Sequence, residues 1–122
     1  MAYGVDLDKT EFTEEDYNKI IAETTKIIEE NSQEQIYIAI AHYNRGWVYY
    51  SRYKEDKAIS DFTRAIEIRP GFVHAYGMRA ASFYALKEYE KALSDVKESL
   101  KIDENDQIGV NLLTKITNKM KN

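Results

Sequence analysis

The 122-residue chain contains no cysteine, a single proline and no apolar run long enough to cross a membrane. The lack of cysteine excludes disulfides, thiolate metal sites and cysteine nucleophiles. The net charge is -4 and no basic stripe is present, so binding to nucleic acid through the phosphates is not expected. The first residues show neither the charged nor the apolar region of a signal peptide. These absences leave the compartment open, favour the cytoplasm, and give no reason to expect a cofactor or a metal.

A folded domain is nevertheless indicated by what is present. Hydrophobic residues make up 43% and charged residues 31%, with both signs mixed along the chain. This is the balance of a globular protein rather than of a disordered one. The length fits one domain with a real core.

The chain repeats itself at an offset of 34 residues. Identical residues coincide at several positions, and small or aromatic residues coincide at others. The identical pairs include Ala41 and Ala75, Arg45 and Arg79, Tyr50 and Tyr84, Ala58 and Ala92, and Asp61 and Asp95. A repeat of this length is typical of helical arrays.

Each 34-residue unit predicts two helices, because apolar residues recur at helical spacing. We call the first helix of a unit helix A and the second helix B. The predicted ranges are 38–52 and 55–68 in the first unit, and 73–86 and 89–102 in the second. Small residues such as Gly46 and Ala58 would let the two backbones approach closely, and Pro70 would end the first unit.

The first unit resembles the tetratricopeptide repeat (TPR), whose pattern is W-x2-L-G-x2-Y, then A-x3-F, then A and P. The matching residues are Gly46, Tyr49, Ala58, Phe62, Ala65 and Pro70. The second unit matches at Ala92, has the similar residues Ala80 and Phe83 at the glycine and tyrosine positions, and lacks the proline. His42 and Tyr76 replace the tryptophan of the pattern, and Arg45 and Arg79 replace its leucine.

Helices are also predicted on both sides of the repeats, because one repeat buries its apolar face only against a neighbour. Thr13 is the predicted cap of a helix over 14–30, and Asp106 that of a helix ending near 120. The expected organisation is an irregular arm (1–12), a flanking helix and loop (13–34), two repeats within 35–106 (39–72 and 73–106) and a capping helix (107–122). The resemblance implies an all-α fold, a short right-handed superhelix of about six helices with the A helices on its concave side.

The resemblance also implies a ligand groove lined by fixed positions of helix A. The candidate binding residues are Ile40, Tyr43, Trp47, Tyr50, His74, Ala81 and Tyr84, with Ser51, Gly77, Ala85, Asn111 and Lys115 at further positions. Aromatic rings in a groove suit an extended or helical peptide with apolar anchors. The alternative is that Trp47 and Tyr50 are ordinary core, or that the segment 4–12 folds back into the groove.

Some members of this family grip a C-terminal carboxylate with Lys, Asn and Arg at fixed helix A positions. Tyr43, Trp47 and Met78 occupy such positions here, so chaperone C-termini are not the expected ligands. Arg45 and Arg79 are expected to pair with acidic residues of adjacent helices.

Enzymes and self-assembling scaffolds are the rival classes. His42 and His74 are the only histidines, and no nucleophile motif or glycine-rich phosphate loop accompanies them, so no catalytic residue is expected. We expect a non-catalytic module that binds a protein or peptide partner. Homo-oligomerisation, for example a homodimer, or a scaffold role through the same surface is the alternative.

Overall fold

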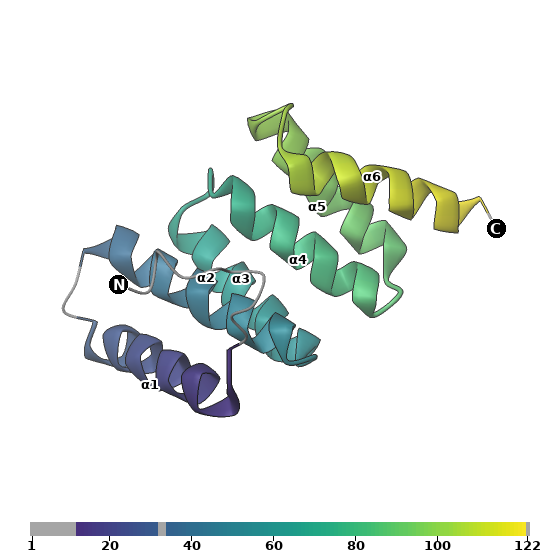
Figure 1. Cartoon of the computed structure of the whole chain (residues 1–122). Coiled ribbons are helices and arrows are strands. Elements are labelled where there is room, and N and C mark those ends of the chain that lie inside the picture. Colours follow the sequence, from purple (N-terminus) through teal and green to yellow (C-terminus); the bar gives the residue numbers. More distant parts are fainter. Residues whose placement is uncertain (1–11, 32–33, 122) are drawn as a thin grey trace, which may run out of the picture.

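The computed structural model describes residues 12–31 and 34–121, and every regular element in this part is an α-helix. The six helices are α1 (Glu14–Glu30), α2 (Gln35–Ser51), α3 (Glu55–Ile68), α4 (Val73–Ala85), α5 (Tyr89–Ile102) and α6 (Gln107–Met120) (Figure 1). The bounds of α1, α3 and α5 coincide with the predicted ones. Helix α2 begins three residues before the predicted position 38, and α4 ends one residue before 86. Except for Phe12, the predicted arm lies outside the described residues.

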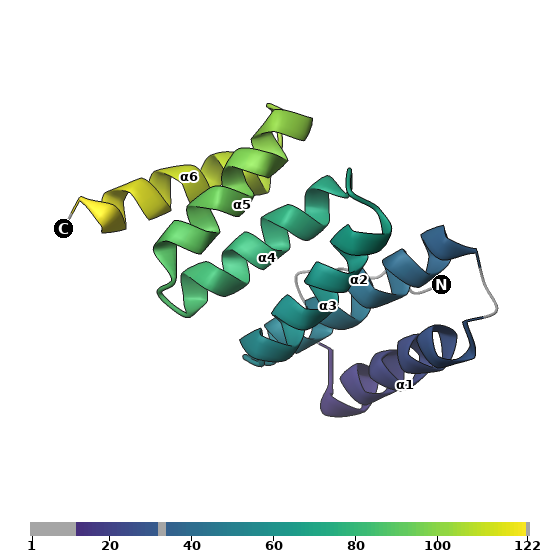
Figure 2. The same ribbon diagram turned by 180° about the vertical axis from the view of Figure 1, so that it is seen from behind.

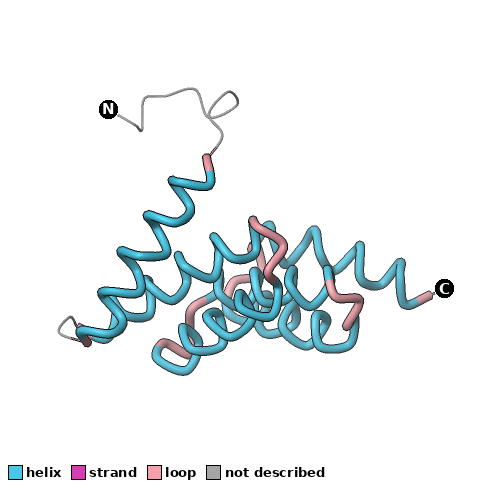
Figure 3. The backbone as a smooth tube through the Cα atoms, turned by 90° about the horizontal axis from the view of Figure 1, so that it is seen from below, coloured by secondary structure: helices cyan, strands magenta, loops and turns pink. Residues whose placement is uncertain are grey.

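The helices pack pairwise, α2 on α3 and α4 on α5, and each pair contacts the next through α3 and α4. Helices α2, α4 and α6 form one layer, nearer the viewer in Figure 1, and α3 and α5 form the other, nearer the viewer in Figure 2. Seen from below, short loops join the helices into one row that ends at the C-terminus (Figure 3). The predicted all-helical, pairwise-packed architecture is therefore confirmed.

Two helix starts are capped as the sequence predicts. The Thr13 hydroxyl accepts a hydrogen bond from the Asp16 amide at 3.1 Å, and the Asp16 carboxylate accepts one from the Thr13 amide at 2.8 Å. The Asp106 carboxylate accepts from the Gly109 amide at 2.9 Å. These bonds satisfy amides that have no partner within the helix, and so define where α1 and α6 begin.

The contact between helix A and helix B is made by residues of different size in the two repeats. In the first repeat Gly46 faces Phe62, and a Cβ added at Gly46 would lie 2.8 Å from the ring. In the second repeat the equivalent residues are Ala80 and Val96. Phe62, Ala80 and Val96 are all fully buried. The larger ring in the first repeat thus requires a glycine opposite it.

A buried Arg–Asp pair joins helices A and B in both repeats, as predicted for Arg45 and Arg79. Arg45 donates from Nε and Nη2 to the two carboxylate oxygens of Asp61, both at 2.8 Å. Arg79 makes the same two bonds to Asp95, at 2.8 and 2.7 Å. Planar bidentate pairs of this kind fix the angle between the two helices as well as their distance.

Each arginine also reaches the helix that precedes its repeat. Arg45 donates from Nη1 to the Thr25 hydroxyl of α1 at 2.9 Å, and Arg79 donates from Nη1 to the Thr63 hydroxyl of α3 at 3.1 Å. Thr25 thus has the role in α1 that Thr63 has in α3. Helix α1 therefore occupies the place of a helix B.

Candidate functional site

Trp47 and Ile40 are the two candidate residues of α2 that remain open to solvent. The two residues are 38% and 36% exposed. The Phe12 ring, just before α1, meets the Trp47 ring edge-on with centroids 6.2 Å apart. Trp47 is therefore available as an apolar anchor, although Phe12 already contacts part of its ring.

Tyr43 packs into the core. Its ring centroid lies 5.0 Å from that of Phe72 and 5.7 Å from that of Phe62. Burial, and secondly the charge of Asp106, raise the pKa of Tyr43. This ring therefore contributes to packing between the repeats, and only the part of it that remains exposed could contact a ligand.

Tyr50 faces a hollow of about 300 Å³ between the C-terminal ends of α2 and α4. Its lining residues are Tyr50, Ser51, Tyr53, Glu55 and Ala85. The half-buried Tyr50 ring also packs against the buried Ala58, Phe62 and Met78. The structure thus brings together three positions that the repeat pattern assigns to the groove, Tyr50, Ser51 and Ala85. Tyr53 and Glu55 also line it, and the pattern did not indicate them because they lie in the turn and in helix B.

The three candidates on α4 differ in exposure. His74 is exposed in the first turn, whereas Ala81 and Tyr84 are half-buried. Ala81 and Tyr84 pack against the core formed with α5 and α6, and the Tyr84 ring lies 5.6 Å from that of Tyr89. On this helix, His74 is thus the candidate most open to a ligand.

A second hollow, of about 560 Å³, lies on the other side of α2, towards α1. Ile20, Asn44, Trp47 and Val48 line it. The open surface of α2 is therefore divided, with Trp47 facing α1 and Tyr50 facing α4.

His42 belongs to a polar centre on the α3 side of α2, beside a hollow of about 420 Å³ that also includes Arg64 and Glu67. His42 Nδ1 donates to Asp61 at 2.9 Å, in addition to the two bonds from Arg45. Burial alone would raise the pKa of Asp61, but the hydrogen bonds and charges of His42 and Arg45 outweigh it, and the pKa lies below its usual value. Three donors occupy this carboxylate, so it is held in a structural role rather than poised as a base.

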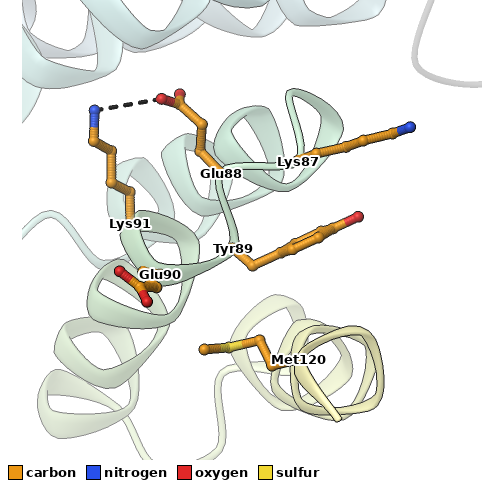
Figure 4. Close-up of a pocket in the computed structure, with 6 residues that line it drawn as sticks. All are labelled: Lys87, Glu88, Tyr89, Glu90, Lys91 and Met120. Carbon is orange, nitrogen blue, oxygen red and sulfur yellow. Dashed lines mark hydrogen bonds and ion pairs between the residues drawn. The ribbon is translucent and has the colours of Figure 1, made fainter. Parts of the chain in front are cut away.

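A fourth hollow, of about 470 Å³, lies between the α4–α5 turn and the end of α6. Lys87, Glu88, Tyr89, Glu90, Lys91 and Met120 line it, and Lys91 pairs with Glu88 (Figure 4). Within residues 12–31 and 34–121, no group of three His, Cys, Asp or Glu side chains is placed to hold a metal ion. In the same ranges, no helix is both long and apolar enough to span a bilayer.

Comparison with protein-family models matches two tetratricopeptide repeats, at residues 39–72 and 73–106. The chain belongs to the tetratricopeptide repeat family. The two TPR matches are adjacent and in register, and together they cover just over half of the sequence.

Known TPR proteins are similar to this chain in sequence and in structure. Rat serine/threonine-protein phosphatase 5 is 33% identical over 96 residues, which are 79% of this chain and 18% of the phosphatase. The first TPR of Spaghetti (RPAP3), bound to the HSP90 peptide SRMEEVD, superposes with a TM-score of 0.80 at 25% identity, covering 87% of this chain and 81% of that one. The TPR2B domain of yeast Sti1, in a pHsp70 complex, gives 0.67 at 27% identity, covering 88% and 82%.

The chain spans less than a fifth of the phosphatase that it matches. The shared region is the repeat domain, so the similarity gives no reason to assign phosphatase activity to this chain. Two of the structural neighbours hold peptide or chaperone ligands on the same fold.

Proposed function

We propose that this chain is a non-catalytic interaction module whose concave surface binds a peptide or protein segment through aromatic and apolar side chains of α2 and α4. The residues assigned to this surface are Ile40, Tyr43, Trp47, Tyr50, His74, Ala81 and Tyr84. The observation that carries the proposal is the exposure of Trp47, a large ring that a partner could bury at small entropic cost. The hollow beside Tyr50 and Ala85 would receive a second side chain of the ligand.

The ligand is expected to differ from peptides held by their terminal carboxylate. Of the family's clamp positions, Met78 is 8% exposed and packs with Ala58 and Phe62, and the other two hold Tyr43 and Trp47. None of the three side chains carries a positive charge, so a terminal carboxylate would lose its water without gaining an ion pair.

The test is selection of binding peptides from a random library, followed by affinity measurement with a labelled peptide. We expect the selected peptides to carry aromatic or branched apolar anchors. We expect Trp47→Ala to weaken binding at least tenfold at unchanged helicity. Ile102→Ala, which truncates an equally exposed apolar residue at the end of α5, serves as the matched control and should leave the affinity unchanged.

The peptide SRMEEVD provides the opposing comparison. We expect it to bind weakly, with little dependence on its free carboxylate. Tight binding that is lost on amidation of its C-terminus would contradict the proposed ligand class. Loss of helicity in Trp47→Ala would show that this ring is core and not a site.

Self-association through the same aromatic surface is the second candidate function. The exposed rings of α2 would support it, because a copy of the chain could bury them as well as a peptide would. In that case, a selected peptide would compete with the self-association.

A further inference from the structure

Among the described helices, the first has the place of a helix B and the last that of a helix A. Thr25 of α1 and Thr63 of α3 both accept a hydrogen bond from the arginine of the following repeat, so α1 is equivalent to α3. Helix α6 follows α5 as α4 follows α3, and it packs against α4 and α5. Among the described residues, α1 therefore lacks a helix A that precedes it in its own repeat, and α6 lacks a helix B that follows it.

The place where a helix A would pack against α1 is the hollow of about 560 Å³ between α1 and α2. Its lining residues Ile20 and Asn44 are equivalent to Ala58 and Met78 one repeat later. At that later place the space is filled by α2, whose Tyr43 and Tyr50 pack against Ala58, Phe62 and Met78. A helix A therefore fills the equivalent place one repeat later, and we expect a helix A to fit the hollow beside α1.

The outward side of α6 offers the matching surface. Val110, Leu113 and Thr117 lie 34 residues after Tyr76, Arg79 and Phe83, positions at which helix A faces its own helix B. Val110 is 41% exposed and Leu113 is half-buried. This side of α6 therefore exposes more apolar area than is expected of a helix side that contacts only water.

The charges of the two end helices are opposite. Helix α1 carries six acidic residues and two lysines, whereas α6 carries Lys115 and Lys119 and no acidic residue. Paired A and B helices run antiparallel, so the end of one lies beside the start of the other. A helix α6 docked on α1 would bring Lys119 towards the acidic first turn of α1, where Glu15 lies. This arrangement is attractive in sign.

We propose that a second copy of this chain is the occupant: α6 of one copy docks on α1 of the next and completes a repeat between the two chains. The two surfaces are different, so each dimer keeps one free α1 end and one free α6 end. Association would therefore continue past the dimer as concentration rises. Trp47 also lines the hollow beside α1, so a docked α6 and a peptide bound at Trp47 would compete. Ile20 and Val110, which are substituted below, are not among the residues assigned to peptide binding, so a failure of one proposal can be told from a failure of the other.

Sedimentation of the chain over a wide concentration range tests the proposal. We expect a weight-average mass that rises with concentration from the monomer value of 14.2 kDa to beyond twice that value, and that falls in high salt. Ile20→Glu blocks the α1 end and Val110→Glu blocks the α6 end, so each variant alone should remain monomeric. An equimolar mixture of the two variants should form a 1:1 dimer, because each supplies the end that the other lacks.

Ser94→Glu, an equally charged change at an exposed position of α5, is the control and should assemble like the parent chain. If Ile20→Glu loses helicity, Glu15→Lys tests the same end at an exposed position. A parent chain that stays monomeric at every concentration would overturn the proposal. So would a dimer that neither variant disrupts, or a mixture of the two variants that does not associate.

Discussion

The Asp61 carboxylate accepts hydrogen bonds from His42 and Arg45, and its side chain is only 5% exposed. Asp61→Asn leaves the shape nearly unchanged but removes the charge opposite a half-buried guanidinium. We expect it to lower the free energy of unfolding by about 2 to 4 kcal/mol, because Arg45 loses its counter-charge in a buried setting. Urea denaturation at neutral pH measures the loss. Glu98→Gln, which removes the charge of an exposed pair with Lys101, should change stability by less than about 0.5 kcal/mol.

The pKa of the Asp61 carboxylate determines how the difference in stability between the parent chain and Asp61→Asn depends on pH. Its pKa is lower in the folded state than the ordinary value of about 3.9. The stabilisation by the ionised form is therefore present above that value and is lost as pH falls through the folded pKa. We expect the stability gap between the parent chain and Asp61→Asn to narrow in acid. A gap that stays constant down to the acid limit would mean that charge is not the cause.

Of these side-chain interactions, the sequence predicted the kind of partner but not the network. An arginine at the leucine position of a helical repeat indicates an acidic partner on the next helix, and Asp61 and Asp95 provide it. His42 also binds Asp61, and this contact depends on how α2 and α3 are rotated relative to each other. The spacing of residues along the sequence does not reveal that rotation. Tyr43 shows the same limit. Its position faces both the groove and the next repeat, and only the approach of Phe72 decides that the ring is largely buried.

For paired helices, Gly46 and Phe62 offer a direct test of how helix A meets helix B. A methyl group at Gly46 would lie 2.8 Å from the Phe62 ring, which is fully buried and has little room to move. We expect Gly46→Ala to destabilise the fold by about 1 to 3 kcal/mol, although alanine favours a helix more than glycine does. Thermal and urea denaturation both measure this.

The second repeat supplies the compensating change. It has Ala80 opposite Val96, so Phe62→Val should make room for Gly46→Ala. We expect the double variant to be more stable than the sum of the two single losses by about 1 kcal/mol or more. Strict additivity in this double-mutant cycle would show that the glycine is not required by the ring.

Helix bounds were predicted best where apolar spacing and a cap coincide, as at α1 with Thr13. Helix α2 begins earlier than predicted. Glu34, its cap residue, makes no side-chain cap bond, and the polar residues before it resemble a loop. Helices α3, α4 and α5 begin where predicted although they too lack a side-chain cap bond, because their starts lie inside the repeats. The start of α2 was missed because it lies before residue 39, where the repeat begins.

Across the full stack, the helices differ in how many neighbours hold them. Among the described helices α1 packs only on α2, whereas α3 and α4 each have neighbours on both sides. Arrays of this kind are stabilised by contacts between neighbours, so an end helix can open while the rest stays folded. No single helix sequence contains this information, because it is a property of position in the row.

Hydrogen exchange of the dilute, monomeric chain tests this difference. We expect the amides of α1 to exchange fastest among the helices and those of α3 and α4 slowest. Thr25→Ala removes the acceptor of Arg45 Nη1 and should lower the opening free energy of α1 by about 0.5 to 1.5 kcal/mol, with little change in α4 and α5. Thr63→Ala removes the equivalent acceptor in the middle of the stack and should speed exchange in every helix. Equal exchange in all helices of the parent chain would instead show that the stack opens as one unit, and the two threonine variants would then have the same effect everywhere.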